Sequence, residues 1–379
     1  MSYVVGPLVA AMDPKLLAKE IRKTGFVLEN RIAQELKAAD WTVISNKYYV
    51  DDSEETVREI DLVAYRVSKV QHFEVYTTLI ISCKKSDANA WALLARDINL
   101  KDPNSDWWPL HAWSNDKALG FQLSEASKAR RYHEQVASLG VREALGVPTV
   151  EVFAFQEMDK ASGKPQNDKP IFSAVTSLMK AQAYELSALP ARKKTPSVYQ
   201  FNLLSVVDTD LVRLMFKGSS IDCTPLETEH YLARYIVRKR ETFSRIRFIK
   251  ASAFSLALRD YGRLHQANCK WFGTECDAFY SDIVKDGKRT SVLAEEFKDK
   301  IRWPLSWRLD RQFHRAIDFG NPSIDWSESS NDLSIGVTFP SDVMAFLNSD
   351  PQVKKQVAKA LKAIYRYEGD FHFDEDIPF

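Results

Sequence analysis

The sequence predicts an α/β protein whose mixed central β-sheet is flanked by helices. Three observations support this fold class. Apolar residues recur at helical spacing between residues 14 and 39, where Gly25 interrupts the pattern. Strand-like runs rich in β-branched and aromatic residues follow, and a second group of such runs begins near Val198. A further helix-like segment closes this second group.

The first half of the chain combines one helix with several strands. The predicted helix is Pro14–Ala39, and the predicted strands are Trp41–Val50, Glu59–Val67, Phe73–Cys83 and Val147–Phe155. The connection at residues 68–72 is short, which makes the second and third strands a predicted hairpin. Residues 86–145 are mostly polar and aromatic, with one predicted helix at Gln122–Leu139 that Gly140 ends. Residues 157–196 are predicted to be two loops around a short apolar segment.

The second half begins with strands and ends with helices. The predicted strands are Phe201–Val207, Leu211–Phe216, Glu229–Val237 and Arg245–Lys250, with a turn signal at residues 208–210. The predicted helices are Ala251–His265 and a segment from about Ser341 to Tyr367. This predicts an N-terminal extension (1–14), an α/β domain (15–265) with a large insertion at about 95–200, a mainly helical C-terminal domain (266–368) and an acidic tail (369–379).

Composition excludes several classes of protein. The net charge of +1 means that any nucleic-acid surface must be local. Four cysteines without a CxxC pair indicate the reducing cytoplasm. No apolar run reaches the length that crosses a membrane. No glycine-rich nucleotide-binding motif occurs, so a helicase or ATPase that works with this protein would be a separate chain.

An aspartate and a lysine stand at the facing ends of two neighbouring predicted strands. Asp61 lies near the start of one strand, and Lys84 lies at the end of the next. Side chains alternate along a strand, so Ser82 and Lys84 share one face while the Cys83 side chain enters the other. Mg²⁺ binds oxygen ligands, usually one or two carboxylates with water and substrate phosphate. Asp61 could supply one carboxylate and Cys83 a backbone carbonyl. Lys84 could lie beside the attacked phosphate, and Glu29 could reach the site from the first helix. Alternatively, Lys84 belongs to a solvated strand end.

The order of these elements resembles a known nuclease superfamily. Residues Gly25–Trp41, Glu59–Ala64 and Leu79–Ser86 resemble the PD-(D/E)XK, or restriction-endonuclease-like, superfamily in the order of their elements. The superfamily has a helix with glutamate, a strand with aspartate and a strand ending in ExK, and this chain has the same helix and first strand, with a second strand that ends in lysine. The resemblance covers about residues 15–265. It implies a restriction-endonuclease-like fold and Mg²⁺- or Mn²⁺-dependent cleavage of DNA by water attack on phosphorus.

Ser82 departs from this motif because it stands where the superfamily has a glutamate. Some type II restriction enzymes carry S/T-x-K instead, and an acid 12 or 13 residues beyond the lysine replaces the missing carboxylate. Asp97 follows Lys84 with twelve residues between them. The resemblance therefore implies metal ligands at Asp61, Asp97, Glu29 and the Cys83 carbonyl, and catalytic residues Asp61, Lys84, Glu29 and Ser82. The alternative is a nuclease fold that no longer cuts.

The last residues carry a second resemblance. Residues 373–379 read Phe-Asp-Glu-Asp-Ile-Pro-Phe and resemble the acidic tip of bacterial single-stranded-DNA-binding protein. The Phe379 ring could enter an apolar pocket while its carboxylate meets a basic rim. Partners would be proteins with that tail pocket, such as a helicase, an exonuclease or a replication-restart factor. The predicted partner-binding residues are Asp374, Glu375, Asp376, Ile377, Pro378 and Phe379. Alternatively, the tail folds back on the protein's own DNA groove.

Clustered basic residues are candidate phosphate contacts. The predicted DNA-binding residues are Lys85, Lys128, Arg130, Arg131, Arg238 and Arg240. Such clusters are also typical of solvated faces. Together the patterns predict a bacterial, cytoplasmic, Mg²⁺-dependent DNA endonuclease, recruited through its tail, in anti-phage defence or in DNA repair and replication. The alternative is an inactive nuclease-fold module that docks on repair proteins.

Overall fold

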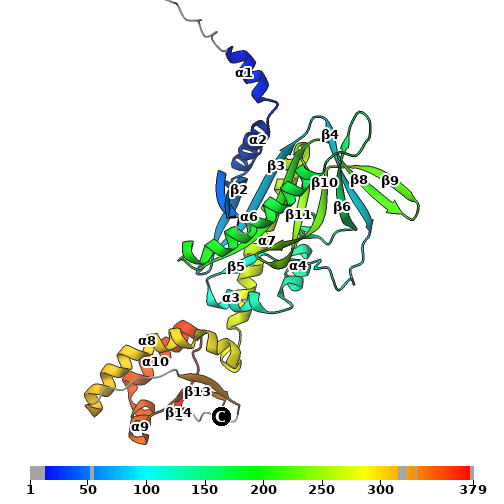
Figure 1. The fold of residues 1–379 in the computed structure, drawn as a ribbon. Coiled ribbons are helices and arrows are strands. Elements are labelled where there is room, and N and C mark those ends of the chain that lie inside the picture. The colour runs from blue at the N-terminus through cyan, green and yellow to red at the C-terminus, as the bar shows by residue number, and fades with distance from the viewer. Residues whose placement is uncertain (1–12, 52–54, 315–321, 329–330, 376–379) are drawn as a thin grey trace, which may run out of the picture. The chain divides into compact units, whose positions relative to one another are not determined.

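A computed structural model describes residues 13–51, 55–314, 322–328 and 331–375. These residues form a mixed α/β structure (Figure 1). The chain divides into two compact units. Unit 1 comprises residues 1–113 and 129–269, and unit 2 comprises residues 114–128 and 270–379. Each unit has its own cluster of buried apolar side chains.

Unit 1 is built on a seven-stranded mixed sheet with the order β1-β2-β3-β7-β11-β10, in which β5 also pairs with β7. The strands are β1 (Thr42–Asp51), β2 (Thr56–Val70), β3 (Phe73–Lys85), β5 (Ala112–Ser114), β7 (Ser197–Asp208), β10 (Thr228–Val237) and β11 (Arg240–Lys250). The first three strands pair antiparallel, while β3 pairs with β7, and β7 with β11, in parallel. The predicted hairpin and mixed sheet are confirmed. β3 lies inside the sheet and is buried almost throughout, which explains its continuous apolar run.

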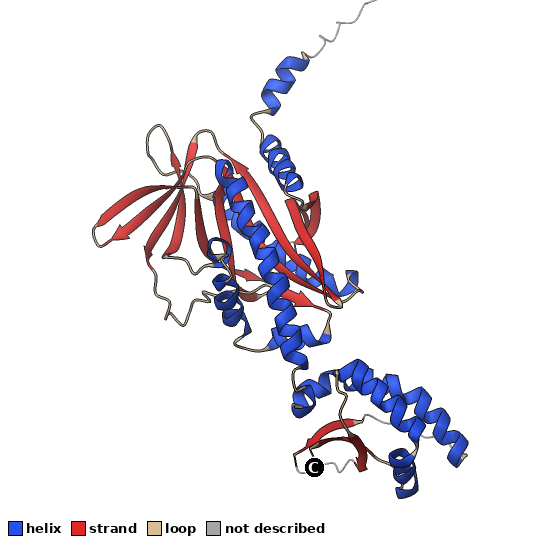
Figure 2. Ribbon diagram, turned by 180° about the vertical axis from the view of Figure 1, so that it is seen from behind, coloured by secondary structure: helices blue, strands red, loops and turns tan. Residues whose placement is uncertain are grey.

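Helices cover both faces of this sheet. The helix α6 (Lys169–Arg192) lies on one face, and α7 (Phe254–Tyr280) crosses the other, as the front and back views show (Figures 1 and 2). The helix α2 (Gly25–Ala38) packs on β1, β2 and β3. Its buried side chains include Leu28, Ile32 and Leu36. Burial of each such side chain contributes about 1.5–3 kcal/mol relative to leaving it in water.

The N-terminal helix is divided where the sequence pattern is interrupted. The structure has α1 (Pro14–Ile21) and α2 in place of one helix at 14–39. Asp13 caps α1, and none of the side chains in α1 is buried. The Lys23 and Thr24 amides bond back to the carbonyls of α1, which closes the first helix before Gly25 begins the second.

The prediction of loops at residues 157–196 is wrong, because α6 occupies most of that segment. Pro170 stands in the first turn of α6, where proline is tolerated, and Pro190 lies near its end. The helix also buries polar residues, including Gln182 and Glu185. Prolines at both ends and polar residues on the buried side obscure the helical period in the sequence.

A four-stranded sheet of order β6-β4-β8-β9 completes unit 1. Its strands are β4 (Asn89–Asp97), β6 (Val150–Asp159), β8 (Leu211–Lys217) and β9 (Ser220–Leu226). The sequence did not predict β4 or β9. The turn at residues 208–210 does not form a hairpin, because β7 and β8 belong to different sheets. The predicted helix Gln122–Leu139 is instead α3 (Lys117–Ser124) and α4 (Lys128–Ser138), followed by the short α5 (Arg142–Leu145).

In its described residues, unit 2 contains α3, the end of α7, three further α-helices and a small sheet. The helices are α8 (Gly287–Phe313), α9 (Ser341–Ser349) and α10 (Pro351–Tyr365). The sheet order is β12-β13-β14, from β12 (Ser323–Ser327), β13 (Asp332–Val337) and β14 (Phe371–Glu375). The predicted helix from 341 to 367 is divided because Asp350 caps α10 and Pro351 opens it.

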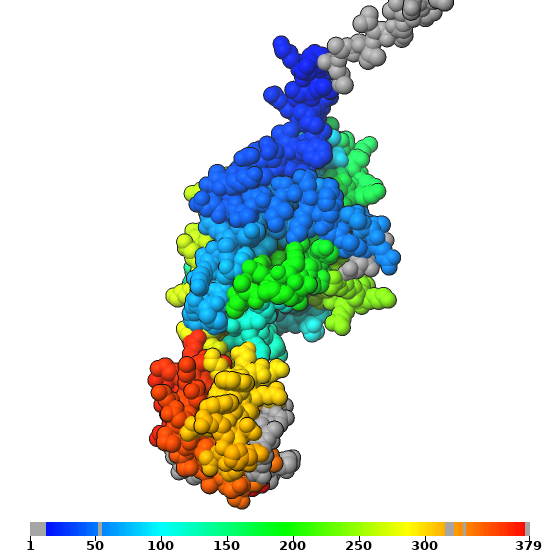
Figure 3. Space-filling model, turned by 90° about the vertical axis from the view of Figure 1, so that its left-hand side faces the viewer, coloured from blue at the N-terminus to red at the C-terminus, as the bar shows by residue number. Residues whose placement is uncertain are grey.

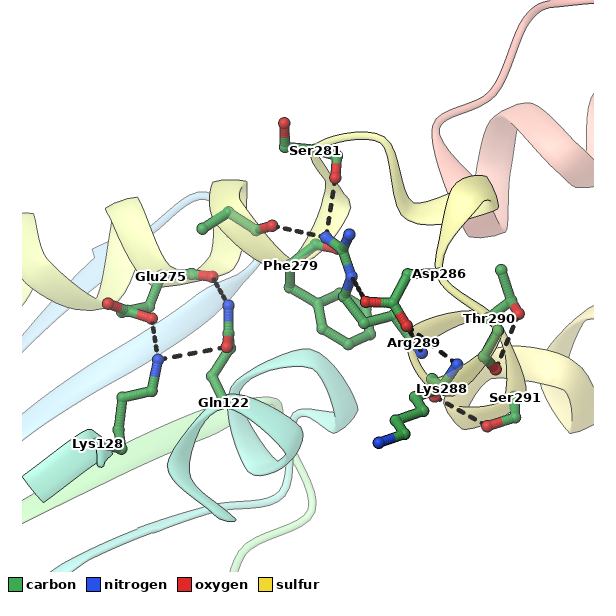
Figure 4. A network of polar contacts seen from close by, with 12 residues as sticks. Gln122, Lys128, Glu275, Phe279, Ser281, Asp286, Lys288, Arg289, Thr290 and Ser291 are labelled. Carbon is green, nitrogen blue, oxygen red and sulfur yellow. Dashed lines mark hydrogen bonds and ion pairs between the residues drawn. The ribbon is translucent and has the colours of Figure 1, made fainter. Parts of the chain in front are cut away.

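Polar contacts, those of Lys128 buried, hold the start of unit 2 together (Figure 4). The Lys128 ammonium donates to Glu275 Oε2 at 2.6 Å and to Gln122 Oε1 at 3.3 Å. Arg289 of α8 donates to the carbonyls of Phe279, in the last turn of α7, and of Ser281, just after it, at 2.9 and 2.8 Å. It also pairs with Asp286, the N-cap of α8. The side chains of α8 thereby satisfy carbonyls that the helix end would leave unpaired. Within the described ranges, no helix is both long and apolar enough to cross a membrane.

Candidate active site at the ends of β2 and β3

The strands β2 and β3 separate beside Asp61. Their pairing runs from Val70 opposite Phe73 to Leu62 opposite Ile81. Residues 56–60 of β2 continue to pair with β1 alone. Asp61 is therefore the first β2 residue beyond the ladder, and a cavity of about 50 Å³ lies where the strands part. Its lining includes Glu59, Asp61, Ser82 and Lys84, together with Ser177 and Leu178 of α6.

Asp61 is held by three groups of β3. Its Oδ2 accepts the Cys83 backbone N–H at 2.6 Å and the Ser82 hydroxyl at 3.3 Å. The Lys84 ammonium lies 3.6 Å from the same oxygen. These contacts fix the carboxylate across the gap between the strands. The structure thus brings together Asp61, Ser82 and Lys84, as the sequence predicted from the alternation of side chains.

Cys83 contributes its backbone to this site. Its side chain is buried, and burial, followed by the charges of Asp61 and Glu29, raises the pKa of the thiol. The thiol is therefore neutral at physiological pH and poorly suited to bind a hard cation. In a strand, the N–H and C=O of one residue point to the same side. The Cys83 carbonyl consequently lies on the same side of β3 as the N–H that bonds to Asp61, where β2 no longer pairs with β3.

Glu29 approaches the strand ends from α2. Its carboxyl is partly buried, and this burial is the main cause of a raised pKa. Repulsion from Asp61 is the second cause and repulsion from Glu59 a weaker one, while Lys84 opposes them. A divalent cation would relieve this repulsion between neighbouring carboxylates. Glu59 was not singled out in the sequence. Its acidic side chain beside Asp61 on β2 was the available signal.

These donors fit a hard divalent cation. Carboxylates at Asp61 and Glu29, the Ser82 hydroxyl and the Cys83 carbonyl are all oxygen ligands, which Mg²⁺ prefers. Within the described part of the chain, no group of three or more histidine, cysteine, aspartate or glutamate residues is arranged to hold a metal. A cation here would therefore have few protein ligands and would retain several waters, which is typical of Mg²⁺ sites that bind phosphate.

The structure does not bring Asp97 to Asp61. Asp97 is the last residue of β4 and is exposed to solvent. β4 begins beside the end of β3, where the Asn89 amide bonds to Ser86 Oγ at 3.0 Å. It then extends eight residues, or about 26 Å at about 3.3 Å per residue. β4 pairs with β6 and β8 in the second sheet, with a register shift between Leu94 and Ala95, and this pairing extends the chain instead of folding it back after Lys84.

The predicted basic surface is only partly exposed. The prediction that Lys128 binds DNA is wrong. Its side chain is 2% exposed and pairs with Glu275, so it is a buried structural cation and cannot contact a phosphate. Lys85 points away from Lys84, donates to the Arg22 carbonyl at 3.1 Å and lies 3.7 Å from Asp87. Arg130 pairs with Glu134 and lies over the Trp108 ring. The remaining predicted contacts, Arg131, Arg238 and Arg240, are exposed.

Part of the predicted acidic tail is a strand. β14 pairs in parallel with β13, and Phe373 is buried in the core of unit 2. Asn348 exchanges two hydrogen bonds with the Phe373 backbone, at 2.9 and 2.7 Å. Asp374 and Glu375 belong to this strand and are exposed, while Asp376, Ile377, Pro378 and Phe379 lie outside the described residues.

Comparison with known proteins adds no relative. No protein-family model, curated protein or solved structure matches this chain. Function is therefore inferred from the side chains gathered at the ends of β2 and β3.

Proposed function

We propose that this protein is a Mg²⁺-dependent endonuclease that hydrolyses phosphodiester bonds in DNA, on a restriction-endonuclease-like fold of the PD-(D/E)XK type. The observation that carries the proposal is the contact of Lys84 with Asp61 across two strands that separate beside them. A half-buried carboxylate that three groups hold in place, beside a lysine at the edge of a cavity, suits metal-assisted phosphodiester hydrolysis.

Asp61, Glu29 and the Cys83 carbonyl would hold Mg²⁺. A bound Mg²⁺ ion lowers the pKa of a coordinated water and polarises the phosphate. Lys84 has a side chain that is 34% exposed, so its ammonium can reach a phosphate while it remains near Asp61. There it would offset the negative charge that develops as water attacks phosphorus.

Ser82 gives the proposed site less negative charge than an ExK site. Its hydroxyl is neutral and donates to Asp61, so it orients the carboxylate and adds no charge of its own. The site should therefore bind its metal weakly. Mn²⁺ accepts the same oxygen ligands as Mg²⁺ and binds them more tightly, so it should support activity at a lower concentration than Mg²⁺.

The second candidate is an inactive module that binds nucleic acid or protein. Ser82 in place of glutamate, and the distance of Asp97 from the site, are the observations that favour it. Cleavage separates the two candidates. The full chain is incubated with supercoiled plasmid, single-stranded DNA and RNA, with Mg²⁺ or Mn²⁺. If the wild-type protein cleaves a substrate and the Lys84→Ala variant does not, the protein is an enzyme. If the wild-type protein leaves every substrate intact, the enzymatic proposal is contradicted.

Recruitment through the C-terminus is a separate part of the proposal. The Asp-Ile-Pro-Phe end would engage a protein with a pocket for the single-stranded-DNA-binding-protein tail. β14 fixes the chain up to Glu375, so the last four residues follow directly from a folded unit. Deletion of Ile377–Phe379 should abolish capture of such a partner by the full chain. An increase in DNA binding after deletion would instead indicate that the tail blocks the protein's own DNA surface.

A further inference from the structure

Two tryptophans of α8 are exposed to solvent. Trp303 is 77% exposed and Trp307 is 51% exposed. They lie four residues apart, which places them one turn apart on the same side of the helix, with a rise of about 6 Å. Tryptophan side chains are normally largely buried, so two exposed rings on one helix call for a function.

The exposed rings face away from the core of unit 2. The opposite side of α8 carries Ile301, Leu305 and Leu309, all buried in that core. These buried side chains attach the helix to the core of unit 2. α8 also forms an outer surface of its unit, coloured yellow in the space-filling view (Figure 3). Packing of unit 2 therefore gives no reason for tryptophan at positions 303 and 307.

Basic residues outnumber acidic residues around the two rings. Residues 298–311 contain five basic and two acidic residues. One of the five, Arg308, pairs with Asp350. Asp299 and Asp310 lie within four residues of a tryptophan on the same side of the helix. The Arg311 guanidinium lies 4.9 Å from the centre of the Trp307 ring, a cation–π contact that keeps this charge beside the ring. Lys300 lies three residues before Trp303 and so shares its side of the helix.

This surface fits nucleic acid better than protein. The buried centre of a protein interface is apolar and depleted of charge, whereas charged side chains border these two neighbouring rings. Aromatic rings with flanking cations are typical of surfaces that bind single-stranded nucleic acid, because each base has a face that can stack. Unpaired bases expose faces that can stack on these rings, whereas the bases of a duplex are already stacked on one another.

We propose that α8 binds single-stranded nucleic acid by stacking unpaired bases on Trp303 and Trp307, with Arg311 and Lys300 contacting the backbone phosphates. The inference rests on the proposed function only in that the protein acts on nucleic acid. Binding at α8 uses neither metal nor Lys84. The surface would hold a displaced or single-stranded segment of the substrate.

The test is fluorescence anisotropy of the full chain with a labelled oligothymidine of about 20 nucleotides, which spans a typical single-strand site. EDTA is present, so no metal-dependent cleavage can occur. Replacement of both tryptophans by alanine should weaken binding at least about tenfold, because each stacked base contributes substantially. Replacement of both by phenylalanine should restore most of the affinity. Arg311→Ala should reduce the slope of log binding constant against log salt concentration by the amount expected for the loss of about one phosphate contact.

Controls separate this inference from the proposed cleavage. Lys359→Ala removes an exposed cation from α10 of the same unit and should leave binding unchanged. In the Lys84→Ala background, which does not cut, replacement of both tryptophans by alanine should weaken binding by the same factor as in wild type. Wild type that fails to bind the oligonucleotide at low salt would overturn the inference. The inference would also be overturned if the double alanine variant bound the oligonucleotide as tightly as wild type does. It would be overturned again if light scattering showed that the variant had mainly lost the ability to form a dimer. Cleavage that fails while binding persists would count against the proposed function alone.

Discussion

Lys84→Ala should separate catalysis from stability. The Lys84 ammonium lies 3.6 Å from Asp61 Oδ2, and the two side chains are 34% and 19% exposed. An ion pair that solvent reaches to this extent contributes roughly 0–1 kcal/mol to stability. The melting temperature should therefore fall by about 2 °C or less. Loss of a group that stabilises transition-state charge typically lowers kcat by about 10²–10³-fold, or about 2.7–4 kcal/mol.

Lys85→Ala is the matched control. Lys85 is the next residue on the same strand, is also partly buried, and points to the other side. Its contacts are the Arg22 carbonyl and Asp87. Its removal should change stability about as much as removal of Lys84. Cleavage should stay within about threefold of wild type, because the Lys85 ammonium bonds to the Arg22 carbonyl, away from the reacting phosphate.

The assay follows conversion of supercoiled plasmid to nicked and linear forms, alongside thermal unfolding of each variant. Equal loss of cleavage in both variants would show that general positive charge at the strand end matters, which refutes the role assigned to Lys84. Full cleavage by Lys84→Ala would refute the site itself. A large drop in melting temperature for Lys84→Ala would mean that the lysine is mainly structural.

Three further predictions concern single residues. Burial, followed by Asp61, raises the pKa of Glu29 above 4.5, so its folded state keeps the proton to higher pH than the unfolded chain. The stability that Glu29 contributes is therefore present below about pH 4.5 and is lost as the pH rises through the pKa of the folded state. Glu29→Gln should remove this pH-dependent contribution, which urea unfolding from about pH 4 to 8 measures. If the unfolding free energy of the variant depends on pH as that of wild type does, the raised pKa of Glu29 is contradicted. Asp61→Asn should abolish the rise in melting temperature that Mg²⁺ gives wild type, which differential scanning fluorimetry detects. Lys128→Ala removes the cation bonded to buried Glu275 and should destabilise the protein by about 3–5 kcal/mol in chemical denaturation; a loss below about 1 kcal/mol would show that the pair is not desolvated as its burial indicates.

The sequence predicted the local part of the site because two simple rules determine it. The short connection between β2 and β3 makes them neighbours, and the alternation of side chains places Ser82 and Lys84 on one face. Neither rule depends on distant parts of the chain. The contact of Lys84 with Asp61 follows from them.

Features that depend on distant packing were not predictable in this way. Lys128 lies on an amphipathic, basic segment, and only the approach of Glu275, far along the chain, makes it a buried residue. The spacing of Asp97 from Lys84 was compatible with a returning loop. Pairing of β4 with β6 and β8, at residues 150–159 and 211–217, instead extends the segment in a second sheet. Sequence spacing fixes the length of chain between two groups, and the sheets that the chain joins fix the distance.

Ser82→Glu tests whether the cleft is a metal site that has lost one ligand. Ser82 is 5% exposed and its hydroxyl bonds to Asp61, so a glutamate here would bring a second carboxylate against the first in a cavity of about 50 Å³. Without metal, repulsion and burial should destabilise the variant by a few kcal/mol. With Mg²⁺, the added carboxylate becomes a ligand, so the melting temperature should rise more than in wild type and cleavage should need less metal. A variant that is destabilised equally with and without Mg²⁺ would show that the cleft does not bind the cation, which would favour the inactive module.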